Sequence, residues 1–221
     1  MADELLAGLE AGARSLGLDL QPQQSSRLLK YLALLSQWGR VYNLTAIRDP
    51  REGLTQHLLD CLAVVPPLRR QCPAGGRLLD VGSGAGLPGL VVATLCPEWH
   101  VTCVDTVAKK MAFVQQAAGQ MGLTGFSTVH ARVESLPGPF EVITARAFAA
   151  LPDLVAWTEQ ALAHSGVWMA MKGRDPLDER AALPPRVEVF HVEPLRVPGL
   201  QAERCLVWMR PSRRCEVPVQ R

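Results

Sequence analysis

The segment from Arg77 to Leu90 constrains the fold of this chain more than any other. It reads RLLDVGSGAGLPGL, in which a short apolar run with no helical period stops at alternating glycines, Gly82, Gly84 and Gly86. Such a run is typical of a buried parallel strand, and the apolar residues that follow Pro88 predict a helix. Glycines allow positive φ and leave no side chain between a ligand and the backbone N–H groups. The segment therefore predicts a nucleotide-binding turn at the carboxyl end of a strand.

The acidic residues near this turn leave two cofactor classes open. Gly84 to Gly89 fits the dinucleotide fingerprint G-x-G-x-x-G literally, which is typical of an NAD(P)-dependent oxidoreductase. Asp105 ends the next apolar run about twenty residues further on, where a carboxylate accepts the ribose hydroxyls of NAD and S-adenosylmethionine alike. Asp80 and the early glycine pair Gly82 and Gly84 favour S-adenosylmethionine, because a carboxylate beside the turn attracts its cationic end and repels a pyrophosphate.

Composition restricts the class of protein. The chain has 221 residues with 48% hydrophobic and 20% charged residues, and its net charge is +2. These values suit a soluble α/β domain with an extension. No apolar run approaches the roughly 18 residues of a membrane helix, and the acidic start lacks a signal peptide's features. We therefore expect a cytoplasmic protein that meets any nucleic acid through a local basic surface.

The cysteines predict neither a zinc site nor a disulfide framework, because none of them forms a C-x-x-C pair. We expect reduced, mostly buried thiols and no bound metal. The six cysteines are Cys61, Cys72, Cys96, Cys103, Cys205 and Cys215.

Apolar periodicity divides the chain into a helical extension over residues 1–70, a core domain over 71–210 and a polar tail over 211–221. In the core domain, apolar runs alternate with helical patterns, which predicts βαβ winding and a parallel sheet. The last two runs are expected to pair as an antiparallel hairpin at one edge. The predicted strands are 77–81, 101–105, 126–130, 140–144, 166–171, 187–192 and 205–209, and the predicted helices are 88–95, 108–121 and 151–162. Seven strands with such a hairpin fit the Rossmann-like sheet of class I S-adenosylmethionine-dependent methyltransferases better than the dinucleotide fold.

The extension is predicted to hold helices over 3–16 and 28–42 and a third helix that Asp49 caps. In the third helix His57 and Asp60 are three residues apart, so we expect them side by side. Pro66-Pro67 is expected to end that helix.

Several methyl-transfer signatures are missing, which restricts the chemistry. The order in Cys72-Pro73 and Cys96-Pro97 is the reverse of the Pro-Cys pair of a cytosine C5 enzyme. The fourth strand ends in Ile143 to Phe148, without the polar residue and two prolines of enzymes that act on exocyclic amines. We identify no covalent nucleophile beside a base, and hence no catalytic side chain. An acceptor such as guanine N7, which attacks without losing a proton, suits a site that works by positioning and desolvation.

These segments together resemble the bacterial family of small-subunit ribosomal RNA guanine-N7 methyltransferases, RsmG or GidB. The resemblance runs from about Leu28 to Met209. The motifs that carry it are Asn43-Leu44-Thr45, His57-Leu58-Leu59-Asp60, Asp80 to Gly89, Arg132-Val133-Glu134, Arg146-Ala147-Phe148, Lys172-Gly173 and Glu203-Arg204. The resemblance implies methyl transfer from S-adenosylmethionine to a guanine N7 of 16S ribosomal RNA, as naked RNA or in the small subunit. Ala145 and Cys61 stand where the family often has serine.

The resemblance also implies the site residues. The cofactor site comprises Gly82, Gly84, Leu87, Asp105, Thr106, Val107, Val133, Glu134 and Arg146. The candidates for RNA contact are Lys172, Arg204 and Arg40. Arg146 in a plain salt bridge and Lys172 as a solvated lysine are the structural alternatives. The rival functions are the oxidoreductase and a non-catalytic RNA-binding module that keeps a vestigial cofactor pocket.

Overall fold

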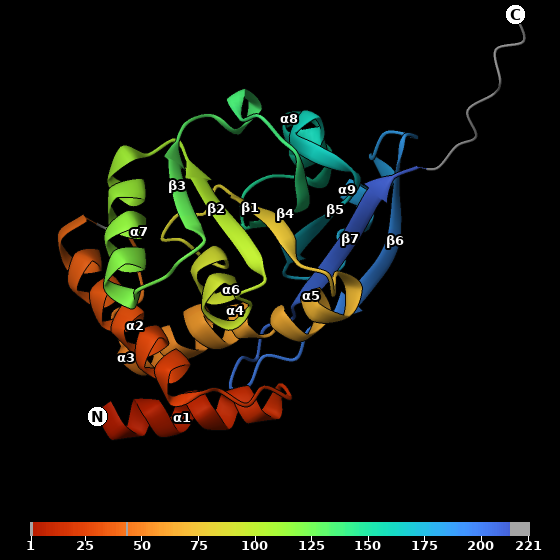
Figure 1. The fold of residues 1–221 in the computed structure, drawn as a ribbon. Coiled ribbons are helices and arrows are strands. Elements are labelled where there is room, and N and C mark those ends of the chain that lie inside the picture. The colour runs from red at the N-terminus through yellow and green to blue at the C-terminus, as the bar shows by residue number, and fades with distance from the viewer. Residues whose placement is uncertain (1, 43, 213–221) are drawn as a thin grey trace, which may run out of the picture.

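The computed structural model describes residues 2–42 and 44–212, with only the backbone given for residues 40–42. Its centre is a sheet of seven strands in the order β3-β2-β1-β4-β5-β7-β6 within this part of the chain (Figure 1). β7 is antiparallel to both β5 and β6, whereas the other neighbours are parallel. The predicted fold class, with a C-terminal antiparallel hairpin, is confirmed.

The predicted strands and helices are present with shifts at their ends, the largest where the second helix begins at Pro22 rather than Leu28. The short helix over 177–181 was not predicted. The strands are β1 (Gly76–Val81), β2 (Trp99–Asp105), β3 (Phe126–His130), β4 (Phe140–Arg146), β5 (Leu162–Lys172), β6 (Val187–Pro194) and β7 (Cys205–Pro211). The helices are α1 (Ala2–Ser15), α2 (Pro22–Tyr42), α3 (Pro50–Gly53), α4 (Asp60–Leu62), α5 (Val65–Gln71), α6 (Gly89–Leu95), α7 (Ala108–Met121), α8 (Leu151–Thr158) and α9 (Leu177–Ala181). The helix expected over 151–162 stops at Thr158, where a 3-10 turn leads into β5.

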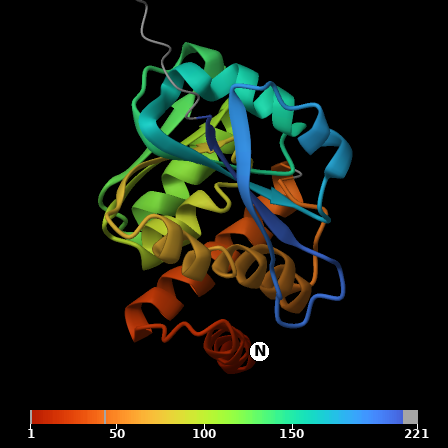
Figure 2. The same ribbon diagram turned by 90° about the vertical axis from the view of Figure 1, so that its right-hand side faces the viewer.

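Alternate residues of the strands face two separate apolar layers. Leu78 of β1 and Cys103 of β2 join a core shared with α2, α6 and α7, whereas Leu79 and Ile143 face α8. Buried residues of the N-terminal helices, such as Tyr31, belong to the first of these cores. Both ribbon views place α1 at one end of the molecule, beyond the sheet (Figures 1 and 2). Within the described residues, no helix combines the length and apolar character needed to cross a bilayer.

The third predicted helix is broken into shorter pieces. Asp49 caps it as expected, since its Oδ1 accepts the N–H of Arg51 at 2.8 Å. A π-helical turn, η1 (Leu54–Leu59), then widens the helix before α4. The prediction that Pro66-Pro67 ends the helix is wrong, because these prolines lie in the first turn of α5. The N–H groups of a first turn have no partner within the helix, so proline is tolerated there.

Asp80 joins β1 to the beginning of α6. Its side chain is completely buried, and its Oδ2 accepts the N–H of Gly89 at 2.8 Å. A Cβ at Gly89 would lie 2.5 Å from Cys103 Sγ and 2.9 Å from Asp80 Oδ2, so only glycine fits there. Burial is the main cause that raises the pKa of Asp80 to about 7. The sequence predicts that the Asp80 carboxylate faces a ligand. In the structure this group is instead buried beneath the turn.

We expect Asp80→Asn to change how stability depends on pH. Between the ordinary pKa of 3.8 and about 7, folded Asp80 holds a proton that the unfolded chain has released. The free energy of unfolding should therefore fall as pH rises through this window, by up to about 1.4 kcal/mol per pH unit. The asparagine variant lacks this component. Urea unfolding of both proteins across the window measures it, and parallel pH profiles would contradict the prediction.

Candidate functional site

Two adjoining cavities open at the carboxyl ends of β1, β2 and β4. The first holds about 380 Å³ and the second about 520 Å³. They share the lining residues Gly82, Lys110 and Ala147. Residues that line only the first include Asp105, Thr106, Val107, Val133, Glu134, Phe148 and Trp157, and residues that line only the second include Thr45, His57, Asp60, Gly84, Leu87, Arg146, Lys172 and Arg204.

The structure therefore gathers the residues predicted for the cofactor and for RNA at one edge of the sheet. The predicted cofactor residues divide between the cavities, with Arg146 in the second rather than beside Asp105. Arg40 is the exception, because its side chain lies outside the part of the chain that the structure describes.

The glycine turn adopts the backbone that its sequence predicts. Gly82, Gly84 and Gly86 have φ values of +61°, +59° and +87°. A Cβ at Gly82 would collide with the ring of Phe148, whereas a Cβ at Gly84 would meet only a carbonyl oxygen 3.9 Å away. The backbone at Gly84 is therefore open to the second cavity.

Asp105 fixes this turn from the end of β2. Its Oδ2 accepts the N–H of Gly84 at 3.1 Å and lies 3.4 Å from Lys110 Nζ. Its Oδ1 accepts the N–H of Val107 at 2.9 Å. The carboxylate thus ties β1 to β2 and lines the first cavity, which is the position that the sequence predicts for it.

An aromatic pair on the first cavity was missed by the sequence analysis as a site feature. The rings of Phe148 and Trp157 meet edge to face with centroids 5.7 Å apart, and each residue is 37% exposed. Ala147, just before Phe148, has a φ of +50°, which is uncommon for a residue with a Cβ. Phe148 ends one of the quoted motifs, but no local signal in the sequence distinguishes Trp157 from a helix core residue.

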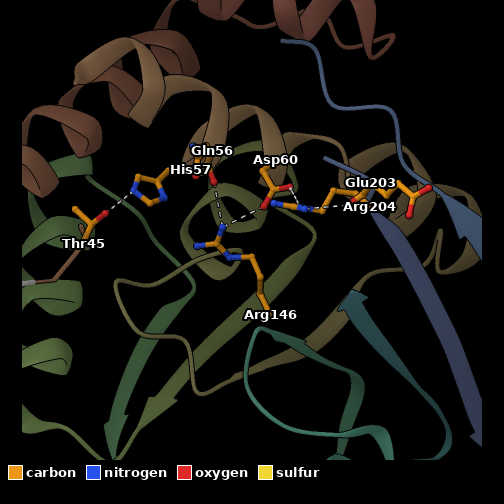
Figure 3. Close-up of polar contacts among 7 residues, drawn as sticks. All are labelled: Thr45, Gln56, His57, Asp60, Arg146, Glu203 and Arg204. Carbon is orange, nitrogen blue, oxygen red and sulfur yellow. Dashed lines mark hydrogen bonds and ion pairs between the residues drawn. The ribbon is translucent and has the colours of Figure 1, made fainter. Parts of the chain in front are cut away.

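In the second cavity Asp60 joins two arginines. Asp60 Oδ2 accepts from Arg146 Nη1 at 3.1 Å, and its Oδ1 accepts from Arg204 Nε at 2.9 Å (Figure 3). Arg146 Nη1 also donates to the carbonyl of Gln56 at 3.2 Å. The carboxylate comes from the beginning of α4, Arg146 ends β4 and Arg204 precedes β7.

His57 and Asp60, expected side by side, line the same cavity but do not bond to each other. His57 Nε2 lies 2.9 Å from the hydroxyl of Thr45, whereas both Asp60 oxygens bond to arginines (Figure 3). The π-helical turn changes the angle between residues three apart, so the α-helical spacing rule does not apply. Burial, followed by the positive charge of Arg146, lowers the pKa of His57 to about 4, so the ring is neutral at pH 7.

Lys172 is held in place rather than freely solvated. Its Nζ donates to the carbonyl of Ala149 at 2.9 Å and to Glu179 Oε2 at 2.7 Å.

The cysteines offer no reactive thiolate at Cys61, since burial raises the pKa of its thiol to about 12. The five described cysteines are free, and no cluster of potential metal ligands occurs among the described residues.

The family model described as rRNA small subunit methyltransferase G matches residues 24–207. This chain belongs to that family. A relative called Ribosomal RNA small subunit methyltransferase G, from Acidovorax sp. (strain JS42), is 62% identical over 212 residues, covering 92% of this chain and 94% of the relative. A protein with the same name from Methylibium petroleiphilum is 61% identical over 210 residues, covering 94% and 95%.

Solved methyltransferases share the fold of this member of the rRNA small subunit methyltransferase G family. The N-methyltransferase NodS from Bradyrhizobium japonicum WM9, in complex with S-adenosyl-l-homocysteine, is similar with a TM-score of 0.58 at 15% identity, covering 82% of this chain and 98% of that one. TrmN from Thermus thermophilus has a TM-score of 0.56 at 20% identity, covering 72% and 53%.

The crowding at Gly82 predicts a sensitive position in this methyltransferase. Gly82→Ala places a methyl group against the ring of Phe148 and forces a positive φ on alanine, at a cost of about 1–2 kcal/mol. We expect a folded protein whose affinity for S-adenosylhomocysteine, measured by calorimetric titration, falls about tenfold or more. Gly119→Ala is the control, since a Cβ there meets nothing within 4 Å. Equal affinities of the two variants would contradict the prediction.

Proposed function

We propose that this chain transfers the methyl group of S-adenosylmethionine to N7 of a guanine in small-subunit ribosomal RNA. The observation that carries the proposal is the pair of cavities that meet at Gly82 and Ala147. The first is lined by the carboxylates of Asp105 and Glu134 and by exposed apolar side chains. The second is lined by Arg146, Lys172 and Arg204 with the single carboxylate of Asp60, and Lys110 lines both. Membership of the rRNA small subunit methyltransferase G family supports the same assignment.

The residues around the glycine turn fit S-adenosylmethionine. The turn leaves the backbone at Gly84 open to the second cavity, and Asp105 and the exposed side chain of Val107 line the first. When bound, the cofactor supplies a methyl group on a positively charged sulfur. Asp105 would accept hydrogen bonds from its ribose, and Val133 and Glu134 would flank its adenine. The residues that would hold it are Gly82, Gly84, Leu87, Asp105, Thr106, Val107, Val133, Glu134 and Arg146.

The second cavity suits an acceptor that needs no general base. Guanine N7 carries an in-plane lone pair, so no proton has to leave before it attacks. Burial and the charge of Arg146 lower the pKa of His57 to about 4, which makes the ring a weak base, and both oxygens of Asp60 accept from arginines. The residues of this cavity would orient the base and exclude water.

The RNA is proposed to approach over the cationic side of the second cavity. Lys172 and Arg204 would contact it there, and Arg40 is a further candidate on α2. The proposal includes naked RNA and the small subunit as substrates. Either substrate places the enzyme in the cytoplasm. An oxidoreductase is not favoured, because the sheet carries the antiparallel β7 between β5 and β6 and the family is one of methyltransferases.

Methyl transfer is tested with RNA and small subunits from a strain that lacks the enzyme. The protein is incubated with them and with cofactor labelled on its methyl group, and the RNA is then digested and its nucleosides separated. We expect label in 7-methylguanosine at one position.

The control for this experiment is Asp105→Ala, which should weaken cofactor binding about tenfold or more and lower labelling at subsaturating cofactor, because two ribose hydroxyls lose their acceptor, at about 1–3 kcal/mol each. RNA already methylated by the enzyme should accept no label. Tight RNA binding without any label transfer would favour the non-catalytic module, and label on another atom would refute the N7 assignment.

A further inference from the structure

The carboxylate of Asp60 is the one buried acidic group in the second cavity, and the reaction proposed above gives it no task. It is only 2% exposed, and its two oxygens bond to arginines from different parts of the chain. Both arginine side chains are 25% exposed and line the cavity. Figure 3 shows the two guanidinium groups converging on Asp60 from β4 and from the segment before β7.

These contacts use two of the five N–H donors of each arginine and fix the direction of its guanidinium group. Arg146 Nη1 donates to Asp60 and to the carbonyl of Gln56. Arg204 donates through Nε to Asp60 and through Nη1 to the carbonyl of Glu203 at 2.8 Å. Each guanidinium group is therefore held at a fixed angle, with part of its fork already occupied by protein oxygens.

An arginine that is free in such a cavity has a strong preferred contact with guanine. Its fork donates to O6 and N7 together, which is the commonest specific contact between arginine and this base. If N7 is the attacking atom, such a contact occupies the lone pair that has to form the new bond. A guanine-N7 methyltransferase with two arginines at its acceptor cavity must therefore keep them from N7.

We propose that Asp60 is a positioning residue that holds Arg146 and Arg204 away from guanine N7, so that its lone pair stays free for methyl transfer. This inference rests on the proposed function, because it takes N7 as the acceptor atom. It makes Asp60 act against RNA affinity, since the carboxylate neutralises one positive charge and restrains two donors. A purely structural salt bridge would not have that effect.

The test compares Asp60→Asn with a matched control, Glu193→Gln. Glu193 also contacts two side chains, since Arg70 Nη2 lies 2.6 Å from its Oε2 and His191 Nε2 lies 3.2 Å from the same oxygen. It lines neither cavity. Both substitutions raise the net charge by one, so the control removes the effect of charge alone.

We expect Asp60→Asn to lower kcat at saturating RNA and cofactor at least tenfold, while RNA affinity stays equal or rises. The slope of log affinity against log salt should not fall, since no phosphate contact is lost. Glu193→Gln should change none of these. Loss of RNA affinity together with kcat and thermal stability would overturn the proposal.

The decisive comparison uses RNA that carries 7-deazaguanosine at the methylated position. For the wild-type protein we expect equal affinity for guanosine and 7-deazaguanosine RNA, because no arginine donates to N7. For Asp60→Asn the guanosine RNA should bind more tightly than the 7-deazaguanosine RNA.

The wild-type arm needs no variant, so it remains informative even if Asp60→Asn does not fold. At least tenfold weaker binding of 7-deazaguanosine RNA to the wild-type protein would overturn the proposal. A different result would refute the proposed function itself: the wild-type protein would then form no 7-methylguanosine at all.

Discussion

The contact between Gly89 and Asp80 determines how closely α6 approaches β1, and the site depends on that approach. A buried carboxylate accepts the helix's N–H at 2.8 Å, and Cys103 of the next strand leaves no space for a side chain at Gly89. The chain between them must then turn within a few residues, which it does at glycines with positive φ. The turn places Gly82 at the junction of both cavities. Asp105 fixes the same turn from β2 through the N–H of Gly84.

The helices before the sheet form part of the site. They share a hydrophobic core with one face of the sheet, so their position relative to the strands is set by burial. That packing carries Thr45, His57 and Asp60 to the second cavity. The first cavity is made by the strands and the segments that follow them, whereas the second needs the N-terminal helices. We relate this division to the two substrates, with the cofactor held by the sheet and the acceptor base held between the sheet and the added helices.

The features predicted from the sequence are those that local patterns determine. The parallel sheet and its C-terminal hairpin follow from the alternation of apolar runs, and the glycine turn and Asp105 follow from spacing within one βαβ unit. The salt bridges of Asp60 were outside the reach of such reasoning, because its partners lie 86 and 144 residues away. The π-helical turn has no clear sequence signal, and the hydrogen bond of His57 to Thr45 was not predicted. Trp157 also has no sequence signal that marks it as a site residue, because its exposure depends on how α8 packs against the sheet.

The most direct measurement of this account is the crystal structure of the protein with S-adenosylhomocysteine. We expect the adenosine in the cavity of about 380 Å³, with ribose hydroxyls on Asp105, and the sulfur near Gly82 and Ala147, where the two cavities meet. The cavity lined by Arg146 and Arg204 should remain open for the base. Adenosine bound in that second cavity, or at a distance from the glycine turn, would contradict the account.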